Sequence, residues 1–186
     1  MVAQQLGPLL NRTVIVENKP GAGTGVGASY VARAAADGDT LLLATSTTLA
    51  VNPALYKKLS YNPARDFAPV ALIAAVPLVV VISPRLPVSN LAELVALARS
   101  KPGGLSYGSA GSGTPQHLGT EIFQSVTGIK ATHVPYKGSA PALMDLLGGQ
   151  LDFMFCDIQP ALPHIKSGKI KALAVSSAHT QAALPG

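Results

Sequence analysis

The residues best suited to chemistry lie in a run of small side chains, YGSAGSGTPQHLG, at positions 107–119. Ser109, Ser112 and Thr114 carry hydroxyl groups, and the glycines between them leave backbone N–H groups uncovered. Thr114 and Pro115 are typical of a helix start, so the free N–H groups and positive dipole end of a helix should face this run. The pattern predicts an anion site. A carboxylate fits best, because no Lys or Arg adjoins the run to balance a phosphate.

Spacing excludes two other uses of this run. A P-loop needs a Lys after its last glycine, and Gly113 is followed by Thr114. A nucleophile elbow has the form G-x-S-x-G, whereas Ser109 and Ser112 directly follow glycines. One alternative stays open, in which Thr114 only caps its own helix and the run binds nothing.

Polar residues near the run could complete a ligand site. His117 lies in the first turn of the predicted helix, within reach of a ligand at the helix N-terminus. In VPYKG, Lys137 could pair with an anion and Tyr136 could wall a pocket, although such residues are equally ordinary at a surface turn. The four histidines lack metal-ligand spacing, and nothing favours a Ser–His–Asp relay, so we expect no metal, cofactor or catalysis. The lone Cys156 lies in apolar LDFMFCDI, which predicts a buried, inert thiol.

A second glycine-rich run, GAGTGVGA at positions 21–28, suggests a runner-up function. Gly23, Gly25 and Ala28 match G-x-G-x-x-A between a predicted strand and a predicted helix, which is the context of dinucleotide binding. The acidic residue expected at the end of the next strand is missing from LLLATSTT. A tight turn with positive φ is therefore the simpler interpretation. A nucleotide-dependent α/β enzyme that uses residues 21–27 is the alternative.

The elements that must position these residues alternate along the chain. Predicted strands lie within residues 13–18, 40–46, 68–83, 105–111, 130–138, 151–158 and 170–177. Predicted helices lie within residues 2–10, 19–38, 52–56, 88–104, 114–128, 139–150 and 159–168. Ser89 or Asn90 should cap the fourth of these helices, and Gly128 should end the fifth. The alternation predicts an α/β fold with a mostly parallel sheet.

Composition excludes several protein classes. The 186-residue chain is 48% hydrophobic, which favours a folded protein. Its net charge of +5 comes from scattered residues rather than a basic stripe with aromatics, so no nucleic-acid partner is expected. The uncharged run at 67–84 contains Pro69 and Pro77 in its interior and indicates buried strand rather than a membrane-spanning helix. No secretory signal opens the chain.

Five segments together resemble the periplasmic solute-binding proteins of tripartite tricarboxylate transporters, the Bug family. These segments are VIVENKPGAGTGVGA, NPALYKKLSYNPARDFAPVALIA, YGSAGSGTPQHLGTEIF, HVPYKGSAPALMDLLGGQLDFMF and PHIKSGKIKALAVSS. The resemblance covers essentially the whole chain in family order. It implies a two-lobed periplasmic binding protein of the type II kind that closes on a small carboxylate. It also implies membrane transporter subunits as partners and no enzymatic activity.

The resemblance also implies where ligand contacts lie. The second lobe would be residues 81–173, with a partial first lobe at 1–80 and a return crossing at 174–186. The family's ligand contacts match positions in both lobes. In this chain they are Ser46, Thr47, Asn52, Ser109, Ala110, Gly111, Ser112, Gly113, Thr114, Pro115, Tyr136, Lys137, Gly138 and Asp157. His117 joins the predicted site residues because of its place in the first helical turn and not through the resemblance. Many members read FDNLPS where this chain has FCDIQP, which displaces the Asp by one position to Asp157.

Two departures from the family pattern concern the first lobe. The opening strand with its Gly-rich loop is absent, and so is the chain that returns after the crossing strand. We therefore expect a central fragment whose unpaired strands favour oligomerisation or strand exchange. A fragment that binds nothing is a further alternative.

Overall fold

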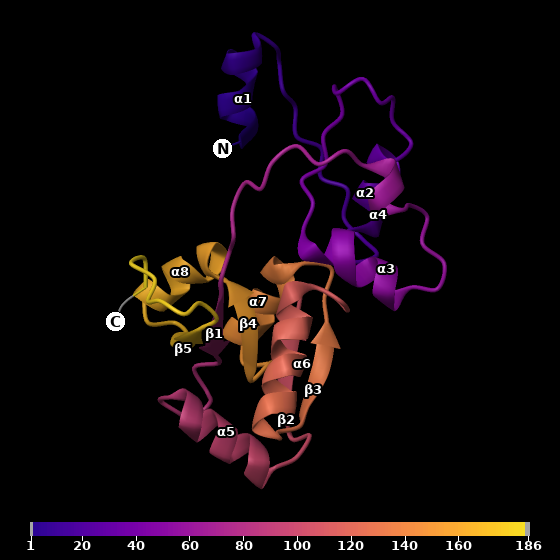
Figure 1. The fold of residues 1–186 in the computed structure, drawn as a ribbon. Coiled ribbons are helices and arrows are strands. Elements are labelled where there is room, and N and C mark those ends of the chain that lie inside the picture. The colour runs from indigo at the N-terminus through magenta and orange to yellow at the C-terminus, as the bar shows by residue number, and fades with distance from the viewer. Residues whose placement is uncertain (1, 185–186) are drawn as a thin grey trace.

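The computed structural model describes residues 2–184, and a five-stranded sheet forms its lower half (Figure 1). The strand order is β3-β2-β4-β1-β5. The bounds are β1 (Leu78–Ile82), β2 (Leu105–Ser109), β3 (Ala131–Pro135), β4 (Phe153–Asp157) and β5 (Lys171–Val175). β2 is parallel to β3 and β4, whereas β1 is antiparallel to β4 and β5. The α/β prediction is confirmed. The expectation of a mostly parallel sheet is wrong, because β1 runs antiparallel to both of its neighbours and makes the sheet mixed.

Four helices connect these strands and cover the sheet. They are α5 (Leu91–Ser100), α6 (Pro115–Thr127), α7 (Ser139–Leu147) and α8 (Ile158–Lys166). Asn90 caps α5 by accepting a hydrogen bond from the Glu93 N–H at 2.9 Å, and the Glu93 carboxylate accepts from the Ser89 N–H in return. Gly128 ends α6 with φ of 70°, as predicted.

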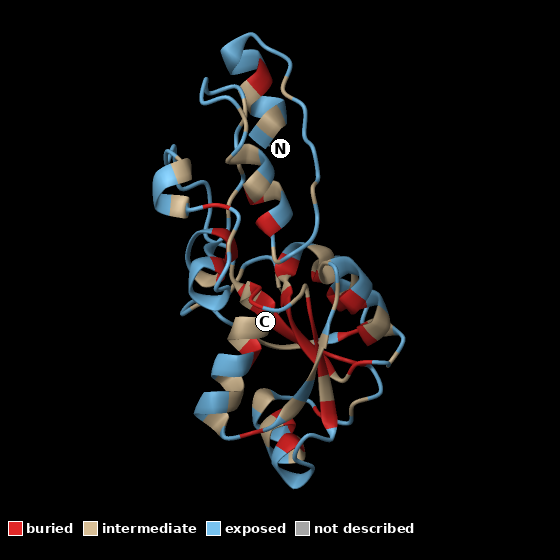
Figure 2. Cartoon of the chain, turned by 90° about the vertical axis from the view of Figure 1, so that its right-hand side faces the viewer, coloured by how far each residue is buried: buried red, intermediate tan, exposed pale blue. Residues whose placement is uncertain are grey.

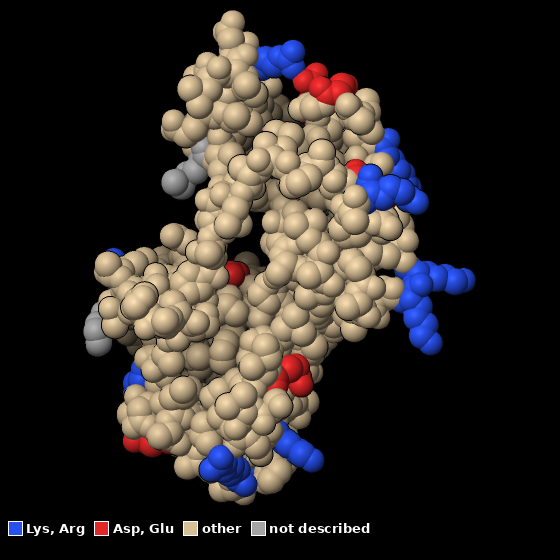
Figure 3. Space-filling view, viewed as in Figure 1, with Lys and Arg blue, Asp and Glu red and all other residues tan. Residues whose placement is uncertain are grey.

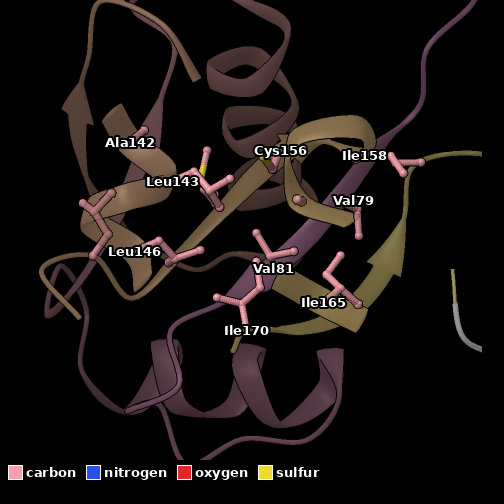
Figure 4. Close-up of a cluster of buried hydrophobic side chains, with 12 residues drawn as sticks. Val79, Val81, Ala142, Leu143, Leu146, Cys156, Ile158, Ile165 and Ile170 are labelled. Atoms are coloured by element: carbon pink, nitrogen blue, oxygen red, sulfur yellow. The ribbon is translucent and has the colours of Figure 1, made fainter. Parts of the chain in front are cut away.

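The alternating side chains of β1 enter two separate cores, one on each face of the sheet. Figure 4 shows Val79 and Val81 with Leu143, Leu146 and Cys156, which come from β4 and α7. Leu78, Val80 and Ile82 enter the other core. All five residues of β1 are buried, because helices or chain cover both faces of this strand. Figure 2 shows the burial concentrated in this half of the molecule.

Residues 2–77, called the N-terminal part below, form short helices without an assigned strand. The helices are α1 (Val2–Leu10), α2 (Gly25–Val31), the π-helix η1 (Thr47–Val51), α3 (Asn52–Leu55) and α4 (Pro63–Asp66). The strands predicted at 13–18 and 40–46 are therefore wrong, and only the last residues of the predicted strand at 68–83 form β1. Within the described residues these segments find no neighbouring strand, and a strand is defined by its partner.

The segments at 13–18, 40–46 and 68–77 have the composition of strands, but many of their apolar side chains are exposed. Ile15 is 74% exposed, Leu43 is 76% exposed and Leu72 is 91% exposed. Figure 2 shows this half of the molecule as mostly exposed chain. The predicted limits of the two lobes stay a prediction. Among residues 2–184, no helix is long and apolar enough to cross a membrane.

Candidate functional site

The loop between β2 and α6 has the shape that its glycines predict. Gly111 has φ of 126° and Gly113 has φ of 78°, values that disfavour any residue with a side chain. A Cβ on Gly111 would lie 3.2 Å from the Tyr136 carbonyl oxygen, and one on Gly113 would lie 3.1 Å from Leu55 Cδ2. At both glycines, the close neighbouring atoms and the positive φ exclude larger residues. The backbone of the loop is therefore not covered by side chains at these positions.

Two of the three hydroxyls in this loop are used to hold it together. The Gly111 N–H donates to Ser109 Oγ at 3.1 Å, and Thr114 Oγ1 donates to the Gly111 carbonyl oxygen at 2.6 Å. Ser109 and Thr114 are buried, whereas Ser112 is exposed. Thr114 makes no side-chain cap to α6, so the alternative in which it only caps its own helix does not match the structure. Pro115 is the first residue of α6, as predicted.

Several backbone N–H groups around the loop stay unpaired. In the described part of the chain, the N–H groups of Ala110, Ser112, Gln116 and His117 find no acceptor. Those of Gln116 and His117 belong to the first turn of α6, where a helix leaves its donors free. They add to the positive end of the helix dipole, so negative charge is stabilised here.

The N-terminal part reaches this loop directly. Thr47 Oγ1 donates a hydrogen bond of 3.0 Å to the Gly113 carbonyl oxygen, across 66 residues of chain. Thr47 and Asn52 are fully buried, and Ser46 just before η1 is exposed. The structure thus brings together the two predicted groups of site residues, at 46–52 and at 109–115. Figure 3 shows the surface hollowed between the upper and lower halves of the molecule.

The glycine-rich run at 21–28 packs beside the same contact. Asn52 Nδ2 donates to the Gly23 carbonyl oxygen at 2.8 Å, and the hydroxyls of Thr24 and Thr48 lie 2.7 Å apart. Gly21 and Gly23 have positive φ, which fits the tight-turn interpretation. No strand precedes this run in the described chain and α2 has only 7 residues, so the strand–loop–helix context of dinucleotide binding is missing.

Gln116 and Ser139 belong to the site region but were not predicted. Gln116 Nε2 donates to Asp157 Oδ2 at 2.9 Å and to Ser139 Oγ at 3.2 Å, and Ser139 Oγ donates to Asp157 Oδ2 at 2.9 Å. The three residues come from the ends of α6, α7 and β4. They meet because β2, β3 and β4 are parallel, which brings the helix starts after them to one edge of the sheet.

The turn after β3 places the remaining predicted residues. The Tyr136 N–H donates to the Ser109 carbonyl oxygen at 3.0 Å, and its hydroxyl donates to Asp145 Oδ2 at 2.6 Å. Burial, with the Asp145 hydrogen bond, raises the pKa of Tyr136 to about 12. Lys137 is exposed, and Gly138 precedes α7 with φ of 130°. Tyr136 therefore fixes the turn against α7, and its hydroxyl is already engaged.

Two histidines stand behind the loop. His117 Nδ1 accepts a hydrogen bond from the Gly113 N–H at 3.2 Å, and His133 Nε2 lies 2.6 Å from Ser109 Oγ. Their ring centroids are 4.2 Å apart. Burial, followed by the proximity of His117, lowers the pKa of His133. His133 was not among the predicted site residues.

Two other features lie outside this site. Cys156 is fully buried, and burial raises the pKa of its thiol to about 12, in line with the predicted inert thiol. A groove of about 660 Å³ is formed by α2 and residues 56–60, without any residue of the 109–115 loop. Among residues 2–184, no cluster of side chains could hold a metal ion.

Comparison with known proteins identifies the family. The family model described as "Tripartite tricarboxylate transporter family receptor" matches residues 1–186. The chain belongs to this family. It is 38% identical to protein BugT of Bordetella pertussis, over 100% of this chain and 57% of BugT. This receptor family is not a family of enzymes, and the predicted resemblance is confirmed.

Solved structures agree with this receptor family. Rpa4515 of R. palustris, solved with adipate, is 38% identical with a TM-score of 0.92, over 95% of this chain and 59% of that one. MatC of Rhodopseudomonas palustris, solved with bound malate, is 31% identical with a TM-score of 0.87, over 96% of this chain and 60% of that one. The periplasmic binding protein BugD is 37% identical with a TM-score of 0.89, over 96% of this chain and 60% of that one, so the chain has the fold of periplasmic binding proteins. The chain spans little more than half the length of the relatives it matches.

Proposed function

We propose that this chain serves as a periplasmic receptor that captures a small dicarboxylate for the membrane subunits of a tripartite tricarboxylate transporter. The observation that carries the proposal is the 109–114 loop, whose uncovered N–H groups lie at the N-terminus of α6. Family membership supports the periplasmic location and the transporter partners. The adipate and malate bound by two similar proteins support a dicarboxylate of four to six carbons.

The loop suits a carboxylate more than a phosphate. Its free donors are backbone N–H groups, which hydrogen-bond an oxyanion without adding a full positive charge. No Lys or Arg lies within positions 105–119, so a doubly charged phosphate would be only partly balanced. One ligand carboxylate would therefore sit between the N–H groups of Ala110, Ser112 and the first turn of α6. On the face shown in Figure 3, the Lys and Arg side chains are scattered rather than gathered in a stripe, so this face does not favour a nucleic-acid partner.

The hydrogen bond between Thr47 and Gly113 joins the two halves of the molecule, and this closure is the proposed mechanism of ligand capture. Because Thr47 belongs to the N-terminal part and Gly113 to the loop, their hydrogen bond forms only when the two halves are close. A ligand held by the loop would be enclosed by η1 and α3. Ser46, Thr47 and Asn52 then form the wall opposite the helix N-terminus, and Tyr136, Gly138 and Asp157 bound the loop from its own half.

Isothermal titration calorimetry tests this proposal with succinate, malate, adipate and NAD(H). We expect heat with at least one dicarboxylate and none with NAD(H). Gly113→Ala should abolish that heat, because its Cβ adds strain at positive φ and displaces the loop. Gly128→Ala is the matched control, since it has similar φ at the other end of α6 and its Cβ would meet open space.

The outcomes separate the alternatives. Heat with NAD(H) alone would support the nucleotide-dependent alternative, and silence throughout would support a chain that binds nothing. Equal loss of binding in Gly113→Ala and Gly128→Ala would mean that strain in α6, rather than the loop, governs affinity. Unchanged affinity in Gly113→Ala would remove the loop from the site.

A further inference from the structure

Two imidazole rings stack directly behind the candidate carboxylate loop. His117 comes from the first turn of α6 and His133 from the middle of β3, and their rings are inclined by 29° with centroids 4.2 Å apart. Tyr107 of β2 packs near both rings, with its ring centroid 4.8 Å from that of His133 and 6.5 Å from that of His117. Packing between α6, β3 and β2 therefore restricts the two imidazole rings, so the positions of their nitrogen atoms are fixed.

Each ring holds a different end of the loop. The His117 ring accepts the Gly113 N–H through Nδ1 at 3.2 Å. The His133 ring meets Ser109 Oγ through Nε2 at 2.6 Å, and Ser109 Oγ accepts the Gly111 N–H at 3.1 Å. The positions of the two glycine amides, and hence the direction of the free N–H groups beside them, depend on these contacts.

The contact to Gly113 restricts the charge of His117. An imidazole nitrogen accepts a hydrogen bond only when it carries no proton, and both nitrogens of an imidazolium carry one. The His117 ring must therefore be neutral, with its proton on Nε2. A proton added at Nδ1 would face the Gly113 N–H directly and push this amide away.

The titratable side chains around the two histidine rings do not remove the requirement that the His117 ring be neutral. The titratable side chains that face the rings are Tyr107 on β2 and Glu121 on α6, besides the two histidines themselves. The Tyr107 hydroxyl donates to Glu121 Oε1, and no hydrogen bond joins this carboxylate to either ring in the described part of the chain. Its charge raises the pKa of His133, but burial and the proximity of His117 lower that pKa by more. A charge on one ring would also lie close to the stacked partner, and burial already lowers the pKa of His133.

We infer that His117, held in place by His133, is a positioning residue that keeps the carboxylate loop in its binding geometry only while its ring is uncharged. This inference rests on the proposed carboxylate binding. It adds to that proposal that the receptor releases its ligand as the pH falls. Exclusion of the charged form from the bound state makes Kd larger at pH 6.0, where free imidazoles take up protons, than at pH 8.0.

The test measures the ratio of Kd at pH 6.0 to Kd at pH 8.0 by calorimetry with the same dicarboxylates. His117→Asn places an amide oxygen near the position of Nδ1, where it accepts the Gly113 N–H and does not titrate. We expect a ratio of about two or more for the wild-type chain, and for His117→Asn a ratio near the one set by ligand protonation alone. Ligand protonation is common to all variants, so it cancels in the comparison.

A matched control uses a histidine away from the loop. His164 lies near the end of α8, and His164→Asn should keep the wild-type ratio. Equal ratios in the wild-type chain and His117→Asn would overturn the positioning role while the dicarboxylate proposal stands. A ratio lost in His164→Asn but kept in His117→Asn would overturn it as well.

A second measurement needs no ligand. In the free wild-type chain, the amide resonance of Gly113 should follow the titration of the His117 ring, with the ring nitrogens reporting the Nε2–H tautomer at pH 8.0. In His117→Asn this amide should be independent of pH between 5.5 and 8.0. If the amide resonance of Gly113 does not change as the His117 ring titrates, the inference is overturned. If the amide responds but no carboxylate binds at pH 8.0, the positioning role is supported and the proposed function fails.

Discussion

Replacing Thr47 with Val tests whether the two halves of the molecule must touch for the receptor to hold its ligand. Thr47 is fully buried, and its hydroxyl donates to the Gly113 carbonyl oxygen at 3.0 Å. Val has nearly the same shape but no donor, so the variant leaves a buried carbonyl without its partner. An unsatisfied buried acceptor costs about 1–3 kcal/mol. Because this cost falls on the closed arrangement, dicarboxylate affinity should fall by about 5- to 30-fold for a loss of 1–2 kcal/mol.

Thr48→Val supplies the matched control. Thr48 is the next residue of η1 and is also buried, but its hydroxyl pairs with that of Thr24, within the N-terminal part. Both variants should lower the midpoint of urea unfolding, whereas only Thr47→Val should weaken binding measured by calorimetry. If the two variants lose affinity equally, the loss reflects general destabilisation. If Thr47→Val binds as tightly as the wild-type chain, the contact between the halves plays no part in ligand capture.

Three further predictions concern the sheet and the residues around it. Because burial lowers the pKa of His133, the unfolded chain binds a proton just below pH 6.5 that the folded chain excludes, and the free energy of unfolding should rise with pH through this window. His133→Asn should therefore reduce the slope of the urea midpoint against pH, and equal slopes in the variant and the wild-type chain would contradict this prediction. Cys156, with its pKa near 12, should resist a thiol reagent at pH 8 until urea unfolds the chain; reaction of the folded chain would contradict its burial. Leu146→Ala should cost about 2–5 kcal/mol by urea unfolding because Leu146 is fully buried, while Met144→Ala, at a site 62% exposed, should cost little; similar losses would contradict this packing.

Local patterns were sufficient to predict the elements around the sheet. The Asn90 cap, the Gly128 stop and the Pro115 helix start each depend on neighbours within a few residues, and the structure has all three. The loop between β2 and α6 was predictable for the same reason, because positive φ at Gly111 and Gly113 is a local requirement. Fold class and the candidate loop thus followed from short-range chemistry.

The errors arise where the outcome depends on distant residues. The segments at 13–18 and 40–46 have strand composition, but a strand also needs a partner, and none lies beside them in the described chain. Gln116 and Ser139 gave no local signal, because their meeting at Asp157 is set by the parallel order of β2, β3 and β4. Thr114 fits the cap pattern, yet its hydroxyl turns back to Gly111.

The position of β1 in the sheet has a consequence for the order of events during synthesis. Val80 pairs with Phe155 on one side and with Ala174 on the other, so the strand completes its ladder only with residues near the other end of the chain. Its five apolar side chains, all buried in the fold, leave the ribosome long before β4 and β5 do. Pairings of such long sequence separation form slowly and leave hydrophobic chain uncovered meanwhile. The apolar side chains of β1 should therefore stay uncovered from the time β1 emerges until β4 and β5 have been made.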